Sequence, residues 1–254
     1  MNSSLIVQTG FSSSEKIELC HVENFVKEIF DHFNIDIKEF DFSYGKTNKY
    51  LKYTQKNLEK FRQAYRNENI ERMFFYSLNT SDFEPNSLLI ISLKFDEGVG
   101  LLKCIIAAPL LPDDQFGCFI DLCKIIKNYF PISTCCALLV PEMYYPLSLS
   151  EGILRETVVL CEYKNIARWI WPYSTKLTII GNYNYVGSVD KKIKDDIISV
   201  LDNSKYIIKD DALFFSLSGK ENIGDLILTD KYNKMSKVLI EHNLLGKNEY
   251  HDYL

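Results

Sequence analysis

Short apolar runs separated by turn residues limit the folds that this chain can adopt. The runs RMFFYSL, SLLIISLKF and GLLKCIIAAP follow one another between residues 72 and 109, with NTSDFEPN and DEGVG as separators. Runs of this length, bounded by Asn, Asp, Pro and Gly, are typical of β-strands joined by turns. A membrane helix needs a run of roughly 18 apolar residues, and every apolar run here is shorter. The sequence therefore predicts neighbouring strands in a chain that does not span a membrane.

Further strands are predicted by alternation or by short apolar runs. IDIKEFDFSY (35–44) alternates apolar and polar residues, which predicts a strand with one face in water. STCCALLV reads as a buried strand and KLTIIG (176–181) as another. KYIIK and ALFFSLS predict a β-hairpin whose turn is Asp210–Asp211.

Helices are predicted where apolar residues recur every three or four positions. Ser12 and Glu15 fit a capping box ahead of a first helix that carries Val22 to Phe33 on one stripe. Asp113 or Asp114 caps a later helix, and Thr229 begins a final one that Gly246 closes. The other predicted helices are residues 48–69, with Leu51, Leu58, Phe61 and Tyr65 on one stripe, a segment within 150–166, and a helix opened by Ser188 with Ile193, Ile197 and Leu201.

Mixed strands and helices predict an α+β fold, with a mostly antiparallel or mixed sheet packed against several helices. The 254 residues suit one domain over 1–254, with two subdomains at about 1–150 and 151–254 as the alternative. Hydrophobic residues make up 46% and charged residues 25%, as in ordinary globular proteins. The start, MNSSLIVQTG, lacks the positive region of a secretory signal, so a cytoplasmic location is expected.

The residues that could act in catalysis or bind a metal do not form a known motif in this sequence. His21 and His32 are eleven residues apart on one predicted helix, about 16 Å and too far for one metal ion. The acidic pairs Asp113–Asp114, Asp195–Asp196 and Asp210–Asp211 fall at caps, on a helix and at a turn. The seven cysteines show neither CxxC nor zinc spacing, and most lie in apolar runs, which predicts buried thiols. We therefore expect no catalytic, cofactor-binding or metal-binding residues, although a catalytic group assembled from distant residues stays open.

One segment has an uneven charge. Residues 46–66, KTNKYLKYTQKNLEKFRQAYR, contain seven basic residues and one acidic residue, a net charge of +6 in a chain whose total is −5. Tyrosines lie between the basic residues, as in a helix that follows a phosphate backbone. Two alternatives are a solvated helix face and a surface that steers a charged protein partner.

The only two tryptophans lie in RWIWPYSTKLTIIGNYNYVG (168–187), where Pro172 stops a helix. Local evidence favours a buried corner, because paired tryptophans usually pack in a core. From Arg168 onward the segments follow in this order: Trp–x–Trp–Pro–Tyr, a strand ending at Gly181, a helix from Ser188, ALFFSLSG, the ENIGD turn (221–225) and a closing helix with Tyr232. This order resembles that of the type VI secretion immunity family of bacterial proteins. The similarity covers about residues 85–245, most clearly 166–242, and extends loosely to immunity proteins of polymorphic toxin systems.

This resemblance implies a cytoplasmic, non-enzymatic protein that binds and neutralises a cognate toxin or effector. Its interface residues stay unknown, because such interfaces vary with the partner. The acidic bulk of the chain suggests a toxin with a basic surface. The alternative is a nucleic-acid-binding or regulatory module that uses the basic helix 46–66, with an unrecognised enzyme as a third possibility.

Overall fold

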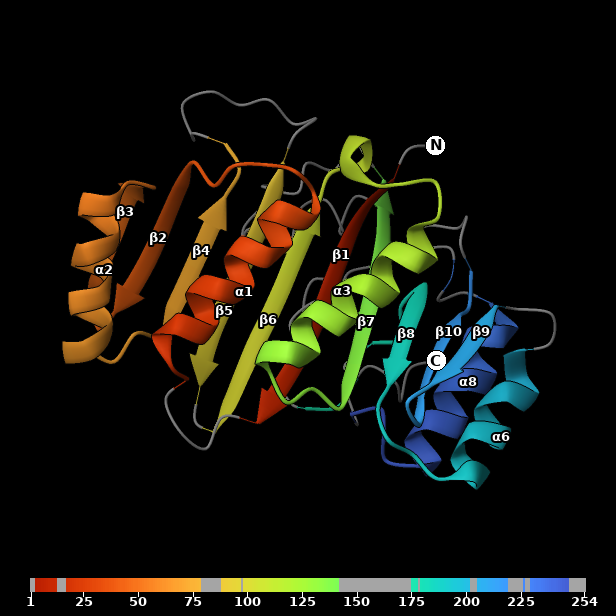
Figure 1. Ribbon diagram of the computed structural model, residues 1–254. Helices are drawn as coiled ribbons and strands as arrows, with labels where there is room; N and C mark the ends of the chain where they lie inside the picture. Colours follow the sequence, from red (N-terminus) through yellow and green to blue (C-terminus); the bar gives the residue numbers. More distant parts are fainter. Residues whose placement is uncertain are drawn as a thin grey trace.

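A ten-stranded antiparallel sheet forms the centre of the molecule in the computed structural model (Figure 1). The strand order is β3-β2-β4-β5-β6-β1-β7-β8-β10-β9, and every pair of neighbours is antiparallel. The structure describes residues 3–12, 17–78, 88–96, 98–141, 175–177, 179–201, 205–218, 226 and 229–246. The strands are β1 (Ser3–Ser12), β2 (Glu39–Tyr44), β3 (Thr47–Lys52), β4 (Arg72–Tyr76), β5 (Leu89–Asp96), β6 (Val99–Ile106), β7 (Thr134–Pro141), β8 (Tyr183–Val186), β9 (Tyr206–Lys209) and β10 (Ala212–Ser216).

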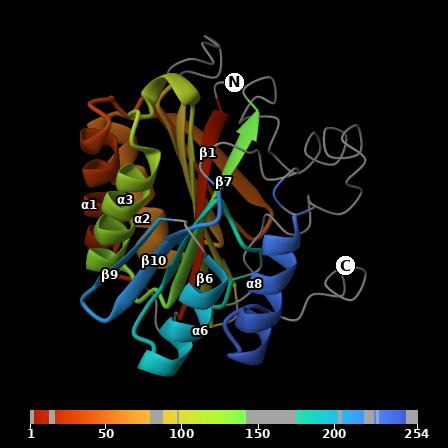
Figure 2. The same ribbon diagram turned by 90° about the vertical axis from the view of Figure 1, so that its right-hand side faces the viewer.

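Helices cover the sheet from both sides, as Figure 2 shows. Three of them pack on what we call the first face, and two pack on the second face near β8 and β10. The first-face helices are α1 (Leu19–His32), α2 (Gln55–Asn67) and α3 (Gln115–Tyr129); the second-face helices are α6 (Lys191–Leu201) and α8 (Asp230–Glu241).

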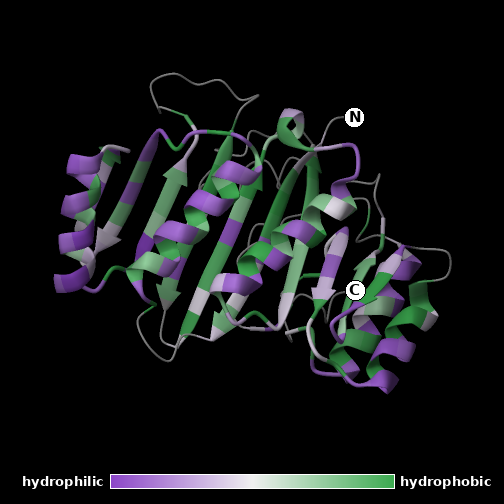
Figure 3. Cartoon of the chain, in the orientation of Figure 1, coloured by the Kyte–Doolittle hydropathy of each residue, from purple (hydrophilic) through white to green (hydrophobic). Residues whose placement is uncertain are grey.

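The first face is an apolar core. Side chains alternate between the faces of a strand, so Leu5 and Val7 point to this side and Ile6 to the other. Phe61 of α2 packs edge-on against Phe40 of β2, with ring centroids 5.6 Å apart. The buried stripe of each helix meets this surface, and the polar stripe faces water, so α2 is mostly hydrophilic in Figure 3.

The second face is covered differently along the sheet. Near β8 and β10 it is apolar and packs against α6 and α8, with Ile197, Leu201 and Leu239 fully buried. Near β2, β4 and β5 the side chains on the same face are largely polar. This polar half lies at the opposite end of the sheet from α6 and α8 (Figure 1).

Several sequence predictions are confirmed. The α+β class with a mostly antiparallel sheet is correct, and the strands predicted between residues 72 and 106 are β4, β5 and β6. Asp114 caps α3 by accepting the N–H of Gly117 at 3.2 Å, and Thr229 caps α8. The predicted hairpin is β9–β10, and its turn residues Asp210 and Asp211 have φ of 50° and 61°.

Other predictions of helix boundaries are wrong. Ser12 does not cap a helix, because it ends β1 and pairs with Val99 of β6. Residues 48–69 are not one helix: the chain forms β3, turns, and begins α2 after Thr54, which caps it. The final helix ends at Glu241, since Asn243 takes the left-handed conformation with φ of 59°.

Two predictions about strands also need correction. The strand expected at 176–181 is absent from the described residues of that range, where Leu177 makes only an isolated bridge to Leu245, and the strand is instead β8. The polar face of β2 is not wet, because Glu39 and Asp41 are only 5% and 8% exposed. A buried acid pair on an otherwise polar face is the first indication of a specialised surface.

Candidate functional site

Four side chains form a cluster on the polar half of the second face, which we call the aromatic–arginine patch: Tyr50, Arg72, Phe74 and Tyr76. The period of two along β4 places its three members on one face. The register then sets Asp41 of β2 between Tyr50 of β3 and Phe74 of β4. Three neighbouring strands, β3, β2 and β4, thus supply one continuous surface.

The patch is a row of neighbouring aromatic rings that ends at Arg72. The ring centroids of Tyr50 and Tyr76 lie 6.0 Å apart, and those of Phe74 and Tyr76 lie 6.1 Å apart. The guanidinium carbon of Arg72 lies 5.1 Å from the centroid of Phe74, within the range of a cation–π contact. Tyr50 is 43% exposed, and the other three side chains are partly exposed. The row is therefore accessible and held in place by its own contacts.

Two buried carboxyl groups of β2 hold the phenols of the patch. The hydroxyl of Tyr76 donates to Oδ2 of Asp41 at 2.6 Å, and the hydroxyl of Tyr50 donates to Glu39. Burial raises the pKa of Asp41, while the Tyr76 hydrogen bond and the positive charge of Arg72 oppose that rise. Burial and the nearby Asp41 raise the pKa of Tyr76 in turn. The phenol of Tyr76 therefore stays protonated and acts as a donor at neutral pH.

Two polar atoms of this cluster lack a hydrogen-bond partner among the residues that the structure describes. They are Oδ1 of Asp41 and Nε of Arg72, and both are buried. Buried polar atoms are nearly always paired, and an unpaired one costs about 1–3 kcal/mol. The patch thus combines an accessible aromatic row with unpaired buried polar atoms beside it, which makes it the candidate recognition site.

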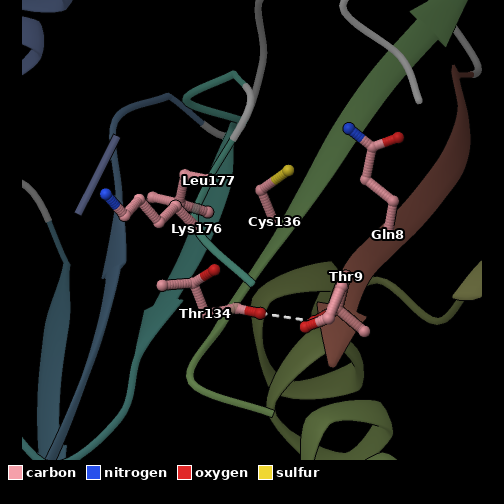
Figure 4. Close-up of a pocket in the computed structure, with 7 residues that line it drawn as sticks. Gln8, Thr9, Thr134, Cys136, Lys176 and Leu177 are labelled. Carbon is pink, nitrogen blue, oxygen red and sulfur yellow. Dashed lines mark hydrogen bonds between the residues drawn. The ribbon is translucent and has the colours of Figure 1, made fainter. Parts of the chain in front are cut away.

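A second polar row crosses the middle of the same face. Ser92, Lys103, Gln8 and Cys136 face one another across β5, β6, β1 and β7. Complete burial lowers the pKa of Lys103 to about 7. Figure 4 shows the small cavity beside Gln8, lined also by Thr9, Gly10, Thr134, Cys136, Lys176 and Leu177. Its volume of about 10 Å³ is the space of one water molecule, so this cavity does not admit a metabolite.

The basic segment 46–66 does not form one helix in the structure. Its basic residues are divided between the turn before β3, β3 itself and α2, so they do not follow one line. Arg62 is engaged by Glu23 of α1, with Nε 2.8 Å from one carboxylate oxygen and a terminal nitrogen 3.0 Å from the other. A second ion pair joins Arg62 to Glu59 at 3.1 Å. The segment therefore does not present its basic residues along one helix, and Arg62 is engaged in ion pairs with Glu23 and Glu59.

The remaining sequence candidates fall in different places. Trp169, Trp171 and Cys161 lie outside the described residues. Five of the other cysteines are buried as predicted, and Cys20 is exposed. Cys20 lies with Glu18 and His21 at the start of α1, where one ligand atom from each lies within 4.8 Å of the others. This group does not have the residue spacing of a zinc motif, because its three members are almost adjacent in the chain.

Comparison with known proteins gives a fold likeness. No family model and no curated protein matches the sequence. Among solved structures, the Pseudomonas aeruginosa T6SS protein PA0821 matches with a TM-score of 0.55 and 10% sequence identity. The match covers 97% of this chain and 77% of that protein. The two proteins therefore share a fold over nearly the whole of this chain.

Within the described residues, no helix is both long and apolar enough to cross a membrane.

Proposed function

We propose that this chain is a bacterial immunity protein that binds and neutralises a cognate toxin of a type VI secretion system in the cytoplasm, without catalysing a reaction. The observation that carries the proposal is the aromatic–arginine patch. Tyrosine and arginine dominate the energetic centres of protein interfaces, and such centres combine ordered aromatic groups with desolvated polar ones. The shared fold with a T6SS protein and the sequence resemblance to secretion immunity proteins support the choice of partner.

The shape of the patch favours a protein partner. Its members lie side by side on a sheet face, and small molecules are usually bound in concave sites that bury most of their surface. A protein surface can cover such a row and bring its own backbone N–H and C=O groups.

The affinity that this role needs sets the size of the interface. A toxin made inside the same cell must be almost completely bound, which requires a Kd of about 1 nM or less, or about −12 kcal/mol. Interfaces of that strength commonly bury on the order of 1,600 Å² in total. The patch would supply the centre of such an interface, and the exposed residues Asn48 and Lys52 on the same face of β3 would supply its rim.

The test is co-expression with the toxic product of the adjacent gene in a susceptible bacterium, followed by measurement of the complex. We expect the wild-type protein to restore growth and to form a complex that is stable on gel filtration. Arg72→Ala and Tyr50→Ala should each weaken the Kd by about 30-fold, the loss of about 2 kcal/mol that defines an interface hot spot.

Arg66→Ala is the matched control, because Arg66 is an exposed arginine at the end of α2, outside the patch. It should leave the Kd unchanged. Thermal melts of each variant separate lost binding from lost folding. A toxic neighbour that the wild-type protein does not neutralise would contradict the proposed function, whereas equal Kd values for Arg72→Ala and Arg66→Ala would contradict the patch as its site.

A further inference from the structure

Strand β9 forms one end of the sheet and exposes three consecutive large apolar side chains. Tyr206, Ile207 and Ile208 are 45%, 44% and 52% exposed, although they belong to a regular hairpin with β10. The register places Tyr206 and Ile208 on the second face and Ile207 on the first. Exposed edge strands with apolar side chains are templates for another strand, and natural proteins usually protect them.

The hydrogen-bonding pattern between β9 and β10 shows which backbone groups of β9 point away from β10. Ser216 donates its N–H to the carbonyl of Lys205 at 2.9 Å, which fixes the phase of the β9–β10 pairing. Residues with odd numbers therefore exchange hydrogen bonds with β10, and the N–H and C=O groups of Tyr206 and Ile208 point to the open edge. The described sheet ends here, so these four groups are available to an incoming strand.

The charges beside the apolar residues discriminate between possible occupants. Lys205, Ile207 and Lys209 lie in a row on the first face, and both lysines are exposed. If a second copy paired with β9 over the whole strand, Tyr206 would oppose Ile208 of that copy. Each Lys205 would then oppose the Lys209 of the other copy, and like charges directly opposite each other destabilise strand pairing. The lysines thus disfavour pairing with a second copy.

We propose that β9 accepts an extended antiparallel segment of a partner protein in which two acidic residues flank three apolar residues. The acidic residues would face Lys205 and Lys209, and the central residue would cover Ile207. The two remaining apolar residues would cover Tyr206 and Ile208 on the second face. The backbone of the segment would pair with the outward N–H and C=O groups, which is the β-strand addition used by several peptide-binding domains. This inference does not depend on the identity of the toxin or on the aromatic–arginine patch.

A peptide experiment tests the segment directly. The probe is a fluorescein-labelled peptide Gly-Glu-Val-Tyr-Val-Glu-Gly, and its control carries Lys at both Glu positions. The wild-type protein should bind the acidic peptide about 10-fold more tightly than the basic one, because two cross-strand charge pairs change sign together. In the double variant Lys205→Glu/Lys209→Glu this preference should reverse, and NMR shift changes should be confined to the β9–β10 hairpin.

Two further variants distinguish the addition of a partner strand from the pairing of β9 with a second copy. Ile208→Pro removes an outward N–H without removing a bond to β10, so it should abolish peptide binding and leave the thermal melt nearly unchanged. Lys205→Glu alone makes the edge self-complementary, so this variant should dimerise on analytical ultracentrifugation more strongly than the wild type. Absence of peptide binding by the wild type, or an unchanged preference in the double variant, would overturn the proposal. A wild-type dimer that Ile208→Pro dissociates would overturn it in favour of a second copy.

Discussion

Replacement of Asn184 by alanine tests how the chain is held where it enters β8. Asn184 lies on β8, next to β7, and is fully buried. Its Oδ1 accepts the N–H of Gly181 at 2.8 Å, and its Nδ2 donates to the C=O of the same residue at 2.7 Å. One side chain therefore satisfies both backbone groups of a buried glycine, at the point where the chain enters β8.

The expected loss follows from those two groups. Asn184→Ala leaves a buried N–H and a buried C=O without their partner, and each unsatisfied group costs about 1–3 kcal/mol. The sum is about 2–6 kcal/mol, and a stable domain has about 5–15 kcal/mol in total. At about 2–4 °C per kcal/mol for a chain of this size, the melting temperature should fall by about 10 °C.

Urea unfolding monitored by circular dichroism measures this loss. Asn48→Ala is the matched control, because Asn48 is exposed on β3 and its replacement should change the free energy of unfolding by less than about 0.5 kcal/mol. A loss below about 1 kcal/mol for Asn184→Ala would refute the reasoning. It would mean that water or a shifted backbone satisfies Gly181 as well as the amide does.

Two other replacements test the second face. Burial lowers the pKa of Lys103 to about 7 from 10.5. Between pH 7 and pH 10.5 the unfolded chain therefore binds one proton more than the folded chain at this residue. Because of this difference, the contribution of Lys103 to the free energy of unfolding rises with pH. Lys103→Met should therefore be more stable than the wild type at pH 6.5, with an advantage that shrinks by pH 9; a constant difference in urea melts would contradict this. A methyl group added at Gly181 would lie 2.3 Å from the carbonyl oxygen of Ala137, so Gly181→Ala should destabilise by about 1–3 kcal/mol. Gly246→Ala, whose added carbon has an ordinary 3.6 Å contact, should not change the melting temperature, and equal melts for the two glycine variants would contradict the close approach.

Elements with a strong local signal could be predicted from the sequence. The Asp210–Asp211 turn is an example, because short acidic side chains tolerate the positive φ that a two-residue hairpin needs. The caps of α3 and α8 are others, since Asp114 and Thr229 bind backbone N–H groups only three residues away. In each case the energy that decides the structure comes from neighbours in the sequence.

Elements defined by distant pairing could not be predicted in the same way. Strand β1 (Ser3–Ser12) contains Gln, Thr and Gly and does not alternate, but it lies between β6 and β7 and is buried on both faces. Strand β3 (Thr47–Lys52) has apolar residues that continue the helical spacing of α2, and only its pairing with β2 makes it extended. Tertiary contacts overrode local preference in both strands.

The aromatic–arginine patch was missed for a related reason. The alternation of Arg72, Phe74 and Tyr76 is visible in the sequence and predicts one face of a strand. The partners Asp41 and Tyr50 come from two other strands, and a shift of one residue in either register would turn them to the opposite face. The sequence therefore showed the part of the site on β4, and the strand order supplied the parts on β2 and β3.

The two proposed interaction surfaces lie toward opposite ends of one sheet, and this has a testable consequence. Seven strand spacings separate β4 from β9, which is about 34 Å at the usual distance between strands. The ends also differ in protection: β3 carries Lys49 and Lys52 at its edge with one exposed aromatic residue, whereas β9 exposes three apolar residues. Residues so far apart share no contacts, so the effects of replacing them on the free energy of toxin binding should add. If the double variant Arg72→Ala/Ile208→Pro lost more or less affinity for the toxin than the sum of its single variants, the two surfaces would be parts of one continuous interface.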